Sequence, residues 1–243
     1  MEQGFLEREA KRANRKNRKL YCILLLVFVL LIGFIGFMVK DSIDLSDYKT
    51  KKILVYLAIL VGFMLVSMVL GLFLSGRAAA DASKSLLLPF KDKTREAVAE
   101  IIDREIAEGK VPVDEYIEAF PEGKTPRGGR IILIPSYLLR INDMGQILVI
   151  PRDKIYWVCA QVGRKGYSSF IVRLLIFTEA KTSFYLDGTD VTHVKEIVDK
   201  LYQYIPNVFS AYDPSVLSYE LDALFDRDRQ AFIQFYESEK AKQ

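Results

Sequence analysis

The chain contains two apolar stretches near its start, LYCILLLVFVLLIGFIGFMV at Leu20–Val39 and ILVYLAILVGFMLVSMVLGLFLS at Ile53–Ser75. Neither stretch contains a charged side chain. As α-helices rising about 1.5 Å per residue, both are long enough to cross a hydrocarbon core of about 30 Å. In lipid, backbone polar groups must be paired within the segment, which favours helix for both. These stretches predict a two-helix transmembrane hairpin over residues 20–75.

The charges that flank the two stretches predict the orientation of this hairpin. Residues 1–19 carry seven Lys or Arg against three Glu, whereas the connecting loop 40–52 has four Lys against three Asp. Basic residues collect on the cytoplasmic side of membrane helices. We therefore expect a multi-pass protein of the plasma (inner) membrane, with both termini cytoplasmic and the lipid bilayer as a partner. The basic segment 1–19 and a domain at 76–243 would both lie in the cytoplasm.

The domain at 76–243 is nearly neutral, with 23 basic and 25 acidic residues. Nucleic-acid binding needs a concentrated positive surface, so we expect no nucleic-acid partner. The chain has two cysteines, Cys22 and Cys159, and one histidine, His193. These are too few for a Cys/His zinc site, and we expect neither a metal nor a cofactor.

Short β-rich runs separated by Gly, Asn and Asp turns follow residue 129 and predict an antiparallel meander. The expected strands are 130–134, 137–141, 146–150, 154–162, 169–177 and 182–186.

Helical patterns flank this meander on both sides. An amphipathic helix is expected at 93–109, followed by a short helical turn at 114–120. A second helix is expected at 191–205 behind Asp190, and a last helix at 214–238 behind the Asp213-Pro214 start signal. The fold class predicted for residues 76–243 is thus α+β.

The run Ile150-Pro151-Arg152-Asp153-Lys154-Ile155-Tyr156-Trp157-Val158 places a short polar corner before a strand, and the hairpin at 163–166 and a closing helix follow. With these features, residues 130–205 resemble bacterial domains of the pleckstrin-homology (PH) type. The resemblance implies a small barrel of seven strands, of which five or six are recognised here. A plain α+β sandwich of sheet and helices remains the alternative. Bacterial proteins of this type often carry the domain beside one or two membrane spans.

Two polar groups are candidates for chemistry. His193 has Glu196 three residues further along its helix, a spacing that suits an acid–base pair or a solvated helix face. Asp222, Asp226 and Asp228 lie on or near one helix face and suit either a cation or, with Arg neighbours between them, a charged surface. In both cases we favour the solvated surface.

Trp157, Arg164 and Lys165 form the candidate interaction surface. Trp157 and Tyr156 are expected on opposite faces of one strand, so that one aromatic ring faces outward. An exposed ring beside Arg164 and Lys165 would suit a protein partner or a lipid headgroup, and core packing is the alternative for the ring.

No recognisable catalytic motif is present, and the predicted function is a non-catalytic interaction domain that the hairpin tethers to the membrane. Its partner would be another protein or a second copy of the chain. The alternatives are an accessory subunit of a membrane transporter or complex, and a membrane-bound enzyme acting on a lipid or envelope substrate.

Overall fold

The structure is a computed structural model that describes residues 4–39, 56, 59, 61–67, 69–70, 82–118, 129–142, 145–165 and 169–243. Side chains at 16–18, 31, 33–39, 164–165 and 169–170 are not among those described. The chain divides into two compact units, residues 1–6 with 83–243, and residues 7–82.

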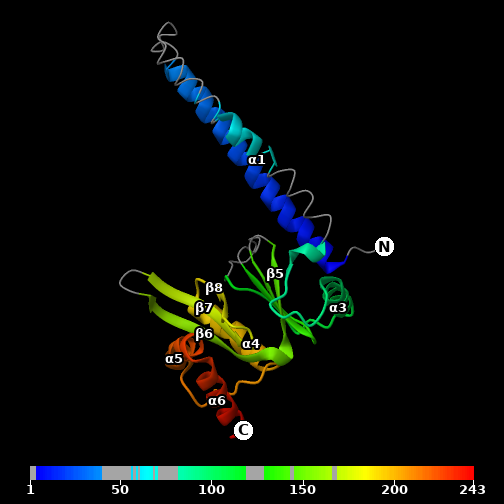
Figure 1. Ribbon diagram of the computed structural model, residues 1–243, viewed down its shortest axis with the longest axis vertical. Coiled ribbons are helices and arrows are strands. Elements are labelled where there is room, and N and C mark those ends of the chain that lie inside the picture. The colour runs from blue at the N-terminus through cyan, green and yellow to red at the C-terminus, as the bar shows by residue number, and fades with distance from the viewer. Residues whose placement is uncertain are drawn as a thin grey trace. The chain divides into compact units, whose positions relative to one another are not determined.

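The helix α1 (Phe5–Val39) supplies most of what is described of the unit at 7–82 (Figure 1). Its first half is polar, with Lys11 donating to Glu7 over 2.7 Å. Its apolar side chains are described from Leu20 to Leu30 and at Ile32, and many of them are exposed, such as Leu26 at 62% and Leu30 at 64%.

No helix among the described residues is long and apolar enough to cross a membrane. For the described part of the chain, the predicted transmembrane hairpin is therefore wrong. The predicted multi-pass localisation in the plasma membrane, with cytoplasmic termini, is wrong for the same reason. Most of the second predicted span, 53–75, lies outside the described residues.

The larger unit contains two sheets (Figure 1). The five-stranded sheet has the order β1-β5-β4-β3-β2, with β1 at Leu86–Leu87, β2 at Val113–Tyr116, β3 at Arg130–Leu133, β4 at Tyr137–Ile141 and β5 at Ile147–Pro151. The three-stranded sheet has the order β6-β7-β8, with β6 at Ile155–Lys165, β7 at Ser169–Thr178 and β8 at Phe184–Asp187.

Neighbouring strands are antiparallel except β1, which pairs parallel to β5. The two sheets do not form a closed barrel, so the barrel form of the predicted fold is wrong. The described α+β arrangement consists of one mixed and one antiparallel sheet, with helices packed against them.

The helices of this unit begin with side-chain caps, of which Asp190 and Asp213 were expected from the sequence. Thr94 caps α3 (Arg95–Ala107), Asp190 caps α4 (Val191–Tyr202), Asp213 caps α5 (Pro214–Arg227) and Asp228 caps α6 (Arg229–Lys240). In each case a side-chain oxygen accepts from an otherwise unpaired backbone N–H of the first turn. Two short 3₁₀ turns, η1 (Ala82–Ser85) and η2 (Arg152–Lys154), lead into β1 and β6.

The sheet β6-β7-β8 has apolar side chains on both faces, because residues alternate along its strands. Val158 and Leu174 join one core, which also contains residues of the five-stranded sheet and of α4. Trp157 and Phe177 join a second, aromatic core under α5 and α6. The larger unit is therefore layered, with β6 and β7 buried between two cores.

Candidate ligand pocket

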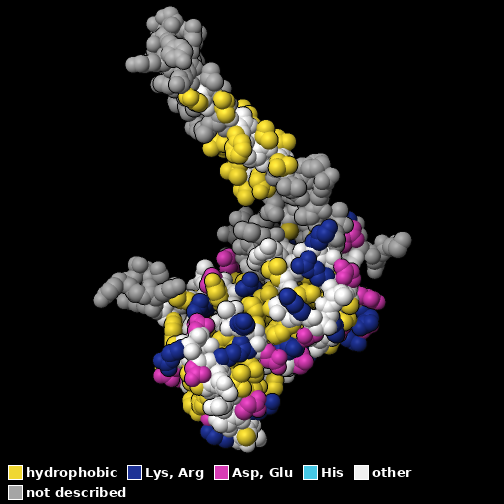
Figure 2. Space-filling model, viewed as in Figure 1, with side chains coloured by type: hydrophobic (Ala, Val, Ile, Leu, Met, Phe, Trp, Pro, Cys, Tyr) yellow, Lys and Arg dark blue, Asp and Glu magenta, His cyan; other side chains and the backbone are white. Residues whose placement is uncertain are grey.

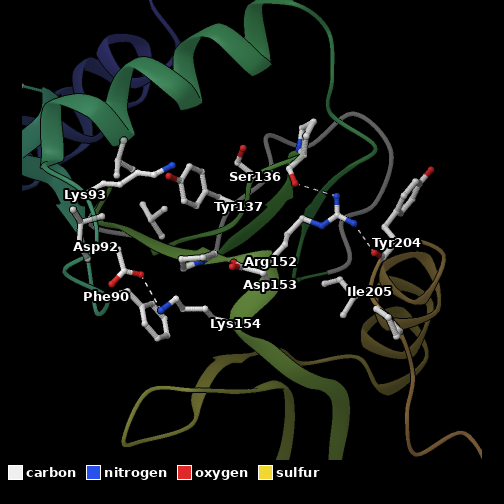
Figure 3. Close-up of a pocket in the computed structure, with 16 residues that line it drawn as sticks. Phe90, Asp92, Lys93, Ser136, Tyr137, Arg152, Asp153, Lys154, Tyr204 and Ile205 are labelled. Atoms are coloured by element: carbon white, nitrogen blue, oxygen red, sulfur yellow. Dashed lines mark hydrogen bonds and ion pairs between the residues drawn. The ribbon is translucent and has the colours of Figure 1, made fainter. Parts of the chain in front are cut away.

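A cavity of about 530 Å³ opens on the larger unit (Figure 3). Four separate parts of the chain line it: the segment from the end of β1 into α3, the corner from β3 to β4, the end of β5 with η2, and the residues that follow α4. Its size falls within the roughly 300–1,000 Å³ of small-molecule sites. The four segments are far apart in sequence, so only the folded chain forms this pocket.

Arg152 connects three of these segments on the side of the pocket where Tyr204 lies (Figure 3). Its guanidinium donates to the carbonyl oxygen of Pro135 over 3.2 Å and to that of Tyr204 over 2.6 Å. Its backbone N–H donates to the carbonyl oxygen of Ser136 over 3.1 Å. A guanidinium has five N–H donors, so these two carbonyls hold its position and leave further donors for a ligand.

Lys154 connects the segment before α3 to the start of β6. Its ammonium lies 2.8 Å from an Asp92 carboxylate oxygen, 3.5 Å from Glu179 and 5.0 Å from the centre of the Phe90 ring. The hydrogen bond to Asp92 raises the pKa of Lys154 above its ordinary value, and the charge of Glu179 acts in the same direction. Lys154 therefore remains charged, and its charge is matched by nearby carboxylates.

Glu105 attaches one corner of the pocket to α3. Its carboxylate, which is buried on α3, accepts from the backbone N–H of Ser136 over 3.0 Å and from the Ser136 hydroxyl over 2.5 Å. Such charge-assisted bonds are stronger than neutral ones. They fix the corner from β3 to β4 against α3.

Tyr137 contributes a tyrosine side chain with its hydroxyl to the pocket wall. Only 4% of the residue is exposed, and its hydroxyl has no hydrogen-bond partner among the described residues. The Lys93 ammonium lies 5.9 Å from the centre of the Tyr137 ring, and Figure 3 shows the two side chains pointing toward one another. A buried hydroxyl without a partner costs free energy, and a ligand that bonds to it would remove that cost.

The predicted surface residue Trp157 lies in the core. It is fully buried, donates from Nε1 to Asn207 Oδ1 over 2.9 Å, and stacks on Phe177. Trp157 therefore packs in the core, which was the alternative considered above, and does not belong to an exposed interaction surface. The side chains of Arg164 and Lys165 lie outside the described residues.

A bulge between Ile155 and Trp157 explains why Tyr156 and Trp157 do not lie on opposite faces of β6 as expected. A bulge adds a residue to one strand and so reverses the side on which the following residues lie. Tyr156 consequently packs with Trp157 in the aromatic core, where its ring contacts Phe232 and Tyr236.

The His193 and Asp222 candidates both have structural partners. His193 Nε2 lies 2.8 Å from the carbonyl oxygen of Tyr116, while its Nδ1 is 4.0 Å from Glu196. Because a carbonyl only accepts, Nε2 carries the proton, and the ring bridges α4 to β2. Asp222 accepts from Arg173 over 3.3 Å and from Ser183 over 3.0 Å, which attaches α5 to the smaller sheet.

Asp228 is the N-cap of α6, so it does not join Asp222 in a cation site. No group of three or more metal-ligating side chains occurs among the described residues. Cys159 is buried, and desolvation raises the pKa of its thiol, which keeps it protonated and unreactive.

Sequence reasoning did not find the pocket, although it singled out the polar corner from Pro151 to Lys154 as part of the resemblance. That corner was the one signal in the sequence, because three charged residues stand there between two largely buried strands. The remaining lining residues carry no motif.

No protein-family model matches this chain, and no curated protein or solved structure matches it significantly. The pocket itself must therefore support any functional argument.

Proposed function

We propose that the larger unit is a non-catalytic interaction module that binds its partner at the pocket around Arg152. The observation that carries this proposal is the fixed geometry of that arginine, whose guanidinium two backbone carbonyls hold in place. Preorganised side chains lose little conformational freedom on binding, which favours affinity. The partner is another protein or a second copy of this chain.

The charge distribution supports a partner other than nucleic acid. On the face seen in Figure 2, basic and acidic side chains of the larger unit are intermingled. A nucleic-acid interface would instead concentrate Lys and Arg on one surface.

Cross-linking in cells tests the proposal with two matched variants of the tagged full-length chain. Tyr204, 41% exposed, lines the pocket, whereas Tyr212, 37% exposed, lies outside it. We expect Tyr204→Ala to lose most of a discrete cross-linked partner and Tyr212→Ala to keep it. Equal capture by both variants at equal protein level, or no discrete partner for the unchanged chain, would contradict the proposal.

A further inference from the structure

We infer that the pocket recognises a carboxylate attached to an apolar group. This inference rests on the proposed function and names the chemistry that the pocket selects. Three observations carry it: the balance of charge around the cavity, the apolar wall, and the hydroxyl of Tyr137.

The charges that line the pocket leave a positive excess facing the cavity. Lys154 is matched by Asp92 at 2.8 Å, but Arg152 bonds to neutral carbonyls, and no carboxylate partner of Lys93 occurs among the described residues. Asp153 is the opposing charge, and both Asp153 and Lys93 are exposed. Two lining cations without a carboxylate partner in the described part of the chain, against one acid, favour a ligand with a single negative charge.

A carboxylate fits the donors on the Tyr137 side of the pocket. The hydroxyl of Tyr137, a residue only 4% exposed, has no partner among the described residues. The Lys93 side chain points toward Tyr137 (Figure 3), and an ammonium and a hydroxyl can both donate to one carboxylate. An uncharged ligand would gain no ionic contribution from Lys93.

The rest of the wall is apolar. Leu88, Phe90, Val98 and Val149 line the cavity, with three proline rings from the surrounding corners. Burying apolar surface contributes about 25 cal/mol per Å², so the apolar part of the ligand supplies affinity and the carboxylate fixes its orientation. A free apolar acid and the C-terminus of a peptide with an apolar last residue both present this chemistry.

Calorimetric titration of the purified full-length chain with decanoate tests the inference, with decanol as the uncharged probe. We expect one decanoate per chain and at least about fivefold weaker binding of decanol. Lys93→Gln should weaken decanoate binding about two- to fivefold, whereas Lys91→Gln, an exposed position two residues away and outside the pocket lining, should not. Tyr137→Phe should weaken it about tenfold, since a hydrogen bond to a charged group is lost.

Two further titrations identify the source of the carboxylate. A short peptide ending in Gly-Leu is compared as the free acid and as the amide. Tighter binding of the peptide acid than of decanoate assigns the site to the end of a protein chain, as the proposed function requires. The reverse assigns the site to a free acid and contradicts the protein partner proposed above.

Equal binding of decanoate and decanol, equal effects of Lys93→Gln and Lys91→Gln, or no binding of any carboxylate would overturn the inference. The titrations need no cellular partner. Their failure therefore differs from a failure of the cross-linking test, which concerns the proposed function.

Discussion

Arg152 shows how one side chain can organise a site by its geometry. Its two bonds to carbonyl oxygens join the corner from β3 to β4 with the chain after α4. Lysine would not replace it, because an ammonium on a flexible stem cannot bond both carbonyls in the same fixed plane. Around it, Glu105 holds the neighbouring corner by hydrogen bonds to Ser136, and Lys154 holds the segment before α3 by its ion pair with Asp92.

The two tyrosines at 137 and 202 allow a direct comparison of hydroxyl groups. Tyr202 donates to the carbonyl oxygen of Val158 over 2.5 Å, whereas the Tyr137 hydroxyl has no partner among the described residues. Tyr202→Phe should lower the free energy of unfolding by about 1–3 kcal/mol, and Tyr137→Phe should leave it unchanged or raise it by up to about 1 kcal/mol. Denaturant unfolding of both variants measures the difference. A loss for Tyr137→Phe as large as that for Tyr202→Phe would show that the hydroxyl is bonded.

The positions of some single side chains could not be predicted from the sequence. The aromatic character of Tyr156 and Trp157 is plain from the sequence, but the bulge that places both rings in one core is not. A bulge depends on the partner strand, β7, and leaves no reliable signal in β6 alone. The same holds for His193, whose partner is the carbonyl of Tyr116, 77 residues away.

Among the elements, the break between α5 and α6 shows how a capping residue divides an apolar pattern. The sequence predicted one helix over 214–238, because its apolar stripe continues from Leu217 to Phe235. In the structure Asp228 leaves the helical conformation at φ −144° and caps α6 by accepting from Ala231 N–H. The guanidinium of Arg229 then donates to backbone carbonyls of Glu179 and Ala180, which fixes the start of α6 over the sheet.

The aromatic core should provide much of the attachment of α5 and α6. Phe232 is fully buried and contacts the rings of Phe177 and Phe225, whereas Val216 on α5 is 58% exposed. Phe232→Ala should lower the free energy of unfolding by about 3–5 kcal/mol. Val216→Ala, the matched control, should change it by less than about 0.5 kcal/mol. Similar effects in denaturant unfolding would show that α6 is not packed as described.

The cap of α5 should make stability depend on pH in the acid range. Hydrogen bonds from the Ser215 hydroxyl and backbone N–H lower the pKa of Asp213 in the folded chain. The stabilisation that ionised Asp213 provides is therefore fully present above its pKa in the unfolded chain, about 3.9. It is lost as the pH falls through the lower pKa of the folded chain. Asp213→Asn keeps a capping side chain without a charge, so its stability should fall less than that of the unchanged chain between about pH 5 and pH 2. Identical pH profiles would contradict this.

Six of the eight described strands were predictable as elements, and β1 and β2 were not. The six strands expected from 130 to 186 correspond to β3 to β8, since alternation and turn residues signal them locally. Strand β2 occupies residues for which a helical turn was expected, and β1 has only two residues. Both are defined by pairing with β3 and β5, and such long-range pairing is absent from a local pattern.

At the scale of the whole molecule, composition and local pattern predicted the classes of structure better than their assembly. The α+β character of residues 76–243 follows from the order of strands and helices, but the barrel did not form and no described helix spans a membrane. The pocket is a property of assembly alone, because its four segments meet only after both sheets and α4 have packed. No single segment carries a motif for it.

The most direct test of the central claim is a photo-reactive residue placed in the pocket of the full-length chain in cells. It replaces Lys93 in one variant and Asp226, an exposed residue of α5 outside the pocket lining, in the other. If the pocket is the binding site, position 93 yields a discrete cross-linked partner and position 226 does not. Equal yields from both positions, or a partner captured only from 226, would contradict the assignment of the pocket as the site of interaction.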